Sequence, residues 1–385
     1  MKTVYWVIFL SVALTVYSLV NLYIFYHGWQ ALPSGSVWRS IYWIVFLLLA
    51  ISYIVGRFLE RLWASPVVNL FTWIGSFWMA AMIYFLLILF LLDLLRLFNH
   101  FLSFSPVWLR THYVQVKLYA FFGVVAAVVL VIIVGFINAC YPKVTTLDLK
   151  IHKRVNGLQD LNIVAASDIH LGTLVGARHI DKLAAMVNAL NPDIVLFAGD
   201  MLDEDMRPER CKNICSGLSL IQPKYGIFAV PGNHEYYVGL ERARQYLKEH
   251  NVTLLTDSAI NIEDKFWLIG RHDMEKRRFT GEKRLELAEL CNGIDKNLPI
   301  ILLDHQPLNL TESATNKVDL QISGHTHHGQ LWPFNYLTRR FYEVSHGYKL
   351  KDTTHIYVSA GYGTWGPPIR TNARPEIVHI RLHFE

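Results

Sequence analysis

Clusters of acidic, amide and imidazole side chains follow five short apolar runs in the second half of the chain. These clusters read Ser-Asp-Ile-His, Gly-Asp, Gly-Asn-His-Glu, Asp-His and Gly-His-Thr-His, in this order. Their metal-competent residues are Asp168, His170, Asp200, Asn233, His234, Asp304, His305, His325 and His327. Carboxylate, amide oxygen and imidazole together suit a borderline divalent ion such as Mn, Fe or Zn.

Seven ligands drawn from these nine residues would be too many for one ion and would suit two ions that share one ligand. Two ions about 3.5–4 Å apart hold both the attacking and the leaving oxygen of an in-line phosphoryl displacement. The chemistry that these residues support is therefore hydrolysis at phosphorus. A lone Gly-Asp or a lone histidine indicates little, because Gly-Asp is common in turns and buried histidines commonly form hydrogen bonds within a core. The specific signal is the ordered set of five clusters.

The apolar runs that carry these residues have the length of strands and alternate with helix-like stretches. They span residues 161–166, 194–198, 226–230, 266–269, 299–303, 318–322 and 355–359. Strands that alternate with helices predict α/β layering, and near-continuous apolar strands indicate burial on both faces. Ligands of open α/β sheets bind beyond the carboxyl ends of the strands, so we expect the clusters to converge there.

The ordered set D-x-H, G-D, G-N-H-E, H and G-H-x-H resembles the calcineurin-like metallophosphoesterase superfamily over about residues 160–384. Gly329-Gln330 and the stretch from Arg370 to Pro375-Glu376-Ile377 look like its membrane-anchored branch. That branch contains YkuE/YaeI-type phosphodiesterases and the animal transmembrane protein with a metallophosphoesterase domain. The resemblance implies a four-layer αββα sandwich of two mixed sheets with two divalent ions, most simply Mn, with Fe or Zn as alternatives.

The resemblance also implies a role for each motif position. The first metal would be bound by Asp168, His170 and His327, and the second by Asn233, His305 and His325. Asp200 would bridge the two ions. His234 would not bind metal and would serve as the general acid for the leaving oxygen, a role suited to an imidazole near neutral pH.

Some positions depart from the patterns of the superfamily. Glu204 stands where its protein phosphatases carry an arginine, which disfavours a phosphoprotein substrate. Asp304 precedes His305 and either orients that histidine or the metal, or faces solvent at a strand end. His328 follows the last ligand pair and is expected near the rim of the site. Arg370 is a further candidate for positioning or for substrate contact.

The first part of the chain has a different composition. Residues 1–140 hold seven Lys/Arg and two acids, whereas residues 141–385 hold 29 of each. Long uncharged runs predict membrane-spanning helices at 4–26, 40–58, 67–92 and 117–139. The interiors of these runs hold almost no ionisable residue, so a membrane anchor is favoured over a transporter.

Loop charges predict the topology of this anchor. An even number of spans puts both termini on one side, and the loop Lys/Arg count of seven against four favours the inside for them. We therefore expect a multi-pass protein of the cell (inner) membrane with its catalytic domain on the cytoplasmic face. Residues 93–116 either lie in the membrane interface or are frayed ends of two neighbouring helices. Residues 331–350 mix aromatic side chains with Arg339 and Arg340, which suits a segment that faces substrate or membrane.

These patterns divide the chain into an anchor at 1–142, a linker and first strand region at 143–159, and a phosphoesterase domain at 160–385. The polar half has no net charge, so the sequence indicates no nucleic-acid partner, and it implies no obligate protein partner. A disulfide framework or zinc ribbon is disfavoured by the few scattered cysteines, which are Cys140, Cys211, Cys215 and Cys291.

Two classes of function remain open. The first is a membrane-bound dinuclear phosphohydrolase, a phosphodiesterase or pyrophosphatase, because an anchor confines the domain to the surface where lipid-linked phosphates are concentrated. The resemblance extends to enzymes that cleave the pyrophosphate of UDP-2,3-diacylglucosamine in lipid A synthesis, and this is the specific substrate that we expect. A phospholipid or another lipid-linked pyrophosphate is the alternative. The second is a non-enzymatic membrane sensor or scaffold that uses a phosphoesterase fold.

Overall fold

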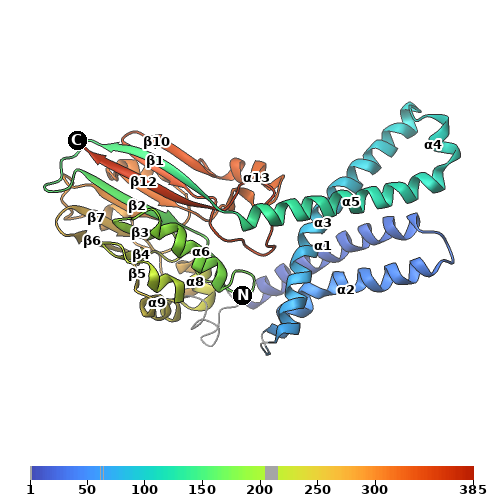
Figure 1. Ribbon diagram of the computed structural model, residues 1–385, viewed down its shortest axis with the longest axis horizontal. Helices are drawn as coiled ribbons and strands as arrows, with labels where there is room; N and C mark the ends of the chain where they lie inside the picture. Colours follow the sequence, from blue (N-terminus) through green and yellow to red (C-terminus); the bar gives the residue numbers. More distant parts are fainter. Residues whose placement is uncertain (1, 61, 64, 204–215) are drawn as a thin grey trace. The chain divides into compact units, whose positions relative to one another are not determined.

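The computed structural model describes residues 2–60, 62–63, 65–203 and 216–385. Within it the chain forms two compact units, Met1–Gly135 and Phe136–Glu385 (Figure 1). Glu204, Cys211 and Cys215 lie outside the described residues, so the expectations that fall on them stay predictions.

The first unit is helical. Its elements are α1 (Lys2–Ala31), α2 (Val37–Glu60), α3 (Pro66–Leu102), α4 (Val107–Thr111) and the greater part of α5 (Tyr113–Cys140). Among the described residues, α1, α2, α3 and α5 are long and apolar enough to cross a membrane. The four expected apolar helices are thus confirmed. The helix α3 begins where Ser65 Oγ accepts a hydrogen bond from Val67 N, with Pro66 at the first helical position.

Aromatic side chains and one satisfied polar pair hold these helices together. The Phe46 and Trp78 rings meet edge to face at 5.1 Å between centroids, and Trp78 Nε1 donates to Asn21 Oδ1 at 3.0 Å. Residues 93–102 continue α3 and residues 113–116 begin α5. The segment 93–116 therefore contains the end of α3, the short helix α4 and the start of α5, and these helix ends are regular, not frayed.

The second unit is built on two mixed sheets. Among the described residues, each sheet has six strands, in the orders β1-β12-β2-β3-β4-β5 and β10-β11-β9-β8-β7-β6. The first sheet contains β1 (Lys143–Ile151), β2 (Asp160–Ala166), β3 (Ile194–Phe197), β4 (Ile227–Ala229), β5 (Val252–Leu254) and β12 (Glu376–Phe384). The second contains β6 (Ser258–Ile262), β7 (Phe266–Gly270), β8 (Ile300–Leu303), β9 (Leu320–Ser323), β10 (Gly347–Lys351) and β11 (Thr354–Val358). The strands that end at the candidate ligands, β2-β3-β4 and β8-β9, pair in parallel.

Successive side chains of a strand point to opposite faces of its sheet, so one set packs between the two sheets and the other packs against the covering helices. Leu161 and Ile163 of β2 pack with Leu303 of β8 in the core between the sheets. Val164, which follows Ile163 and points to the other face of the sheet, packs instead with Ile180 of a covering helix. The helices on the first sheet include α6 (Ala177–Asn188), α8 (Asn233–Val238) and α9 (Leu240–Glu249), and α11 (Leu287–Leu290) packs on the second. The expected α/β sandwich of two mixed sheets is confirmed.

Each of the seven apolar runs overlaps a strand, but the sequence reasoning missed other strands. The most consequential is β12, which pairs in parallel with β1 and antiparallel with β2. Its sequence, EIVHIRLHF, alternates apolar and polar residues, so the period of a strand was present. The remaining helical segments are η1 (Ser216–Leu220), α10 (Lys276–Thr280), α12 (Leu310–Thr315), η2 (His327–Gly329) and α13 (Phe334–Phe341).

Candidate metal centre

Loops at the carboxyl ends of strands from both sheets carry the candidate ligands to one place. Asp168 and His170 follow β2, and Asp200 follows β3. Asn233 opens α8 after β4, His305 follows β8, and the loop after β9 carries the last two ligands, His325 and His327. Two residues of the β2 loop are fastened to the β3 loop, since Asp168 N donates to Gly199 O and His170 N donates to Asp200 O, both at 3.0 Å. The sheets thus bring together residues that are far apart in the chain.

The backbone at this place is strained in a consistent way. Five non-glycine residues have φ between +45° and +70°, namely Asp168, His170, Asp200, His325 and His327. Left-handed backbone is costly for such residues and persists only where surrounding contacts impose it, as at functional sites. Two glycines make room for the cluster: a Cβ on Gly232 would overlap the Asp200 carboxylate, and one on Gly324 would overlap that of Asp168.

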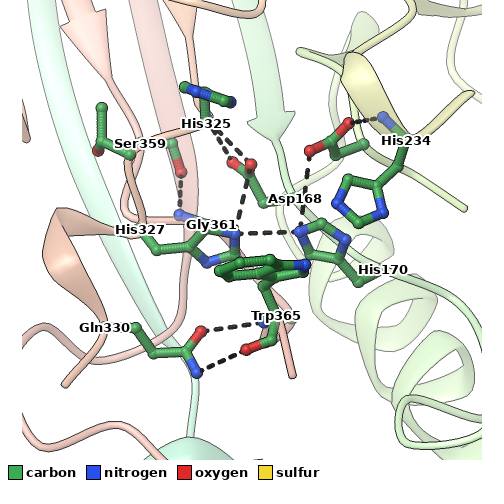
Figure 2. A network of polar contacts seen from close by, with 12 residues as sticks. Asp168, His170, His234, His325, His327, Gln330, Ser359, Gly361 and Trp365 are labelled. Carbon is green, nitrogen blue, oxygen red and sulfur yellow. Dashed lines mark hydrogen bonds and ion pairs between the residues drawn. The ribbon is translucent and has the colours of Figure 1, made fainter. Parts of the chain in front are cut away.

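The first cluster consists of Asp168, His170 and His327, whose candidate donor atoms converge (Figure 2). The two Nε2 atoms of the histidines face each other at 3.0 Å, and His327 Nε2 lies 3.6 Å from Asp168 Oδ1. All three side chains are buried. The orientation of Asp168 is fixed by His325 N, which donates to both carboxylate oxygens at 2.9 and 3.0 Å.

The second cluster consists of Asp200, His305 and His325, with Asn233 beside them. His305 Nε2 lies 3.2 Å from Asp200 Oδ2, and His325 Nδ1 lies 3.0 Å from Asn233 Oδ1. Asp200 Oδ2 also lies 3.9 Å from His170 Nε2 of the first cluster. A single carboxylate oxygen therefore stands between the two groups of donors, which is the position that a bridging ligand requires.

The donor set fits divalent metal ions. His305 Nε2 and His170 Nδ1 are buried and make no well-aligned hydrogen bond within the described part of the chain, although His305 Nε2 lies 3.2 Å from Asp200 Oδ2. Burial lowers the pKa of His170 to about 4 and that of His325 to about 3, which keeps both imidazoles in the neutral form that binds metal. The mixture of carboxylate, amide and neutral imidazole is suited to borderline ions. These side chains can therefore hold two ions.

His234 lies beside the clusters and makes a carboxylate contact of its own. Its Nδ1 is 3.0 Å from Asp203 Oδ1, and its ring centroid is 4.6 Å from that of His170. Burial by itself lowers the pKa of His234, but the hydrogen bond of Asp203 and the charges of Asp200, Asp203 and Glu235 outweigh this effect and raise it to about 9. The imidazole is therefore protonated at neutral pH. His170, Asp203 and His234 also lie close enough to share an ion, so His234 could instead be a ligand.

Sequence reasoning missed two acidic residues that shape this region. Asp203 was not considered as a site residue, although it follows Asp200 of the Gly-Asp element by only three positions. Glu235 is fully buried, and its carboxylate accepts hydrogen bonds from Gly232 N, Asp200 N and Leu202 N at 2.7, 3.1 and 3.0 Å. Glu235 stands three residues after the N-cap Gly232 of α8, the position of the glutamate in a capping box, and this spacing could have revealed its role.

Asp304 does not take either of the places considered for it. Its carboxylate is buried and contacts Arg271 Nη1 at 3.3 Å and Arg284 Nη1 at 2.8 Å. His305 is oriented instead by its own Nδ1, which lies 2.7 Å from Ala198 O. The expectations that Asp304 orients His305 or faces solvent are therefore wrong, because the two arginines occupy its oxygens.

Arg370 and His328 lie around the first cluster without joining it. Arg370 is fully buried, its Nη1 donates to Ala360 O at 2.7 Å, and its Nη2 lies 3.3 Å from His327 Nδ1. This side chain positions His327 and is not open to a substrate. His328 turns away from the ligands, because its Nδ1 pairs with Ser345 Oγ at 2.8 Å.

An exposed tryptophan lies next to His234. The Trp365 and His234 ring centroids are 6.5 Å apart, and Trp365 is 60% exposed. The side chain of Gln330 holds the backbone of Trp365 through two hydrogen bonds. Gln330 Nε2 donates to Trp365 O, and Trp365 N donates to Gln330 Oε1, both at 3.0 Å (Figure 2). The centre therefore has a ring on its accessible side that can contact an apolar part of a ligand.

The comparisons with known proteins agree with this geometry. Residues 161–329 match the calcineurin-like phosphoesterase family. An uncharacterized metallophosphoesterase of Aquifex aeolicus is 32% identical over 225 residues, which cover 58% of this chain and 85% of the relative. The chain belongs to the calcineurin-like phosphoesterase family.

Two further relatives are matched over a smaller share of their own length. An uncharacterized metallophosphoesterase of Helicobacter pylori is 37% identical over 233 residues, which cover 58% of this chain and 60% of the relative. A transmembrane protein with metallophosphoesterase domain from Danio rerio is 33% identical over 261 residues, covering 64% of this chain and 59% of the relative. The matched region thus spans about three fifths of the length of each.

Proposed function

We propose that this family member is a membrane-bound phosphohydrolase that uses two divalent metal ions, a phosphodiesterase or pyrophosphatase. The observation that carries the proposal is the Asp200 carboxylate, whose Oδ2 lies 3.2 Å from His305 Nε2 and 3.9 Å from His170 Nε2. The first ion would be held by Asp168, His170 and His327, the second by Asn233, His305 and His325, with Asp200 shared. Such ions supply positive charge to a phosphoryl group and lower the pKa of water.

The protein's own contribution to the chemistry is proton delivery and rigid positioning. Asp203 engages Nδ1 of His234, which leaves Nε2 as the nitrogen that can release a proton to the leaving oxygen. His234 N donates to Asp200 Oδ1 at 2.8 Å, so the acid and the shared carboxylate are fixed to one another. Arg370 and Glu235 hold the surrounding loops, which keeps the reacting groups oriented.

A turnover assay separates this proposal from a non-enzymatic sensor or scaffold. The full-length protein, purified in detergent, is expected to hydrolyse bis-p-nitrophenyl phosphate when Mn²⁺ is supplied and to lose this activity when a chelator is added. Fe²⁺ and Zn²⁺ are tested in parallel. Absence of turnover with every divalent ion would contradict the enzymatic proposal and favour the scaffold.

We infer further that the substrate is a lipid-linked phosphate, with UDP-2,3-diacylglucosamine as the specific candidate. Four apolar helices and the exposed Trp365 near His234 support this choice. Hydrolysis of the pyrophosphate in that lipid would release uridine monophosphate, which can be measured directly. A lipidomic comparison of cells with and without the protein tests the wider class, because the substrate is expected to accumulate when the protein is absent. The cytoplasmic face of an inner membrane is the location that this substrate requires.

A further inference from the structure

The helix α13 turns its apolar side chains outward. Phe334, Leu337 and Phe341 share one face by their helical spacing, and they are 41%, 53% and 71% exposed. The buried side chain of the helix is the polar Asn335, which is 6% exposed. A surface helix of a water-soluble domain normally has the reverse arrangement. This outer face of α13 therefore needs an apolar environment that the domain itself does not provide.

Two tryptophans extend the apolar face. Trp332, 49% exposed, precedes α13, and Trp365 is held to the same segment through Gln330. Trp332, Phe334, Leu337, Phe341 and Trp365 are called the aromatic surface below. Clusters of exposed large apolar residues mark interaction sites, and indole rings are enriched where a protein meets the interface of a bilayer.

The aromatic surface is bonded to the loop that holds the end of α5. Asn138, in the last turn of α5, donates through Nδ2 to Arg370 O at 2.8 Å. The next residue, Thr371, accepts a hydrogen bond at Oγ1 from Trp332 N at 2.8 Å. Arg374 Nη2, at the end of the same loop, donates to Tyr141 O at 2.7 Å. The end of α5 and the segment that carries α13 therefore lie at the same edge of the second unit.

Positive charge flanks the aromatic surface. Arg340 is exposed and follows Leu337 by three positions on α13, so it flanks the apolar face, whereas Arg339 is exposed on the side of the helix that carries Asn335. Arg339 also lines a pocket of about 340 Å³ together with His328 and Lys349. Glu343 in the same pocket is already engaged, since its carboxylate contacts Lys349 and Lys351 at 2.8 and 2.9 Å. Arginine and lysine beside an apolar helix face suit anionic lipid headgroups.

We propose that the aromatic surface inserts into the interface of the bilayer that anchors this chain, with Arg340 on anionic headgroups. The proposal takes only the membrane anchor from the proposed function and does not depend on hydrolysis. A bilayer is the favoured occupant because α5 ends at Cys140 and β1 begins at Lys143, so the tether keeps the surface permanently near lipid. Docking here sets the rim of the metal centre, marked by Trp365, at the level of the headgroups.

Depth-dependent quenching tests this docking in the full-length protein. A fluorescent amino acid is placed at Phe341, and at the exposed Lys296 before the amino end of β8 as a matched control. The protein is reconstituted into vesicles that contain phosphatidylglycerol and lipids with a nitroxide near the headgroup. Quenching at position 341 is expected to exceed that at position 296 by about threefold or more, because only the former contacts lipid. Equal quenching at the two positions overturns the proposal.

Charge and apolar variants sharpen the result. Arg340→Ala is expected to lower quenching at position 341 by about twofold or more in anionic vesicles and to change it little in neutral ones. Leu337→Glu should abolish the excess quenching, whereas Leu220→Glu, at an exposed apolar residue of η1, should not.

Self-quenching between labelled copies without lipid quenching would assign the surface to a second copy and overturn the proposal. Lipid quenching without hydrolysis of any phosphoester would reject the proposed function and leave the docking intact.

Discussion

The two carboxylate oxygens of Asp200 have different neighbours, and this arrangement suits Asp200 to hold the turn of His234 with one oxygen and to bridge two ions with the other. Oδ1 accepts from His234 N, whereas Oδ2 faces His305 and His170. Asp200→Asn preserves the shape of the side chain and removes the charge that two ions would share. We expect the variant to lose at least one bound ion and most of its turnover. Metal analysis and the bis-p-nitrophenyl phosphate rate measure both, with Asp264→Asn at an exposed loop as the control. Two retained ions with a near-normal rate would contradict the assignment.

His234 allows metal binding and proton transfer to be separated. If it is the general acid, His234→Ala should retain both ions and lower kcat by about 10²–10⁴-fold with a poorly leaving alcohol. The loss should shrink with p-nitrophenolate, which needs little protonation. Asp203→Asn should act in the same direction, because Asp203 holds Nδ1 of the imidazole. An equal loss with good and poor leaving groups would point to electrostatic stabilisation instead, and loss of an ion would identify His234 as a ligand.

At the scale of elements, β12 joins the two sheets through one buried carboxylate. Glu376, its first residue, is fully buried and accepts hydrogen bonds from Thr145 Oγ1 of β1 at 2.7 Å and from Tyr357 OH of β11 at 3.1 Å. His346 Nε2 and Ala360 N also contact it at 3.0 and 3.1 Å. Burial alone raises the pKa of Glu376, but these hydrogen bonds and the charge of His346 lower it to about 2.

This depressed pKa predicts an acid-dependent loss of stability. A carboxyl group whose pKa is lower in the folded protein stabilises the fold above its unfolded pKa, near 4.5, and this contribution disappears as the pH falls toward about 2. Glu376→Gln should therefore destabilise the second unit by about 3 kcal/mol at pH 7 and by much less near pH 3. Melting of both proteins in detergent across this pH range measures the difference. A gap that stays constant with pH would rule out the ionised carboxylate as its origin.

At the scale of the whole molecule, metal binding is expected to stabilise the second unit. Its ligands come from both sheets, so ions that bind only the folded state hold the two sheets together. At a free Mn²⁺ concentration about 100 times the Kd, this linkage contributes about 2.7 kcal/mol. The melting temperature of the full-length protein should rise with Mn²⁺ and fall with a chelator, and in Asp200→Asn it should respond much less. A melting temperature independent of metal in both proteins would argue against occupied sites.

The sequence alone determined the features that depend on local pattern. Apolar length predicts the four helices of the first unit, and the apolar runs with their polar ends predict the α/β class, the strand ends and the donor types of the metal centre. These signals are readable because hydrophobic periodicity and ligand chemistry belong to short segments. The strand β12 carried the same kind of signal and was overlooked.

Only the tertiary structure decided which side chains meet. Asp304 pairs with Arg271 and Arg284, Asp203 engages His234, and Asp200 Oδ2 lies between two groups of histidines. The outward face of α13 likewise depends on Asn335 being the side chain that packs inward. None of these contacts follows from local spacing. Each depends on how the two sheets and their loops pack against one another, and this packing joins segments that are far apart in the sequence.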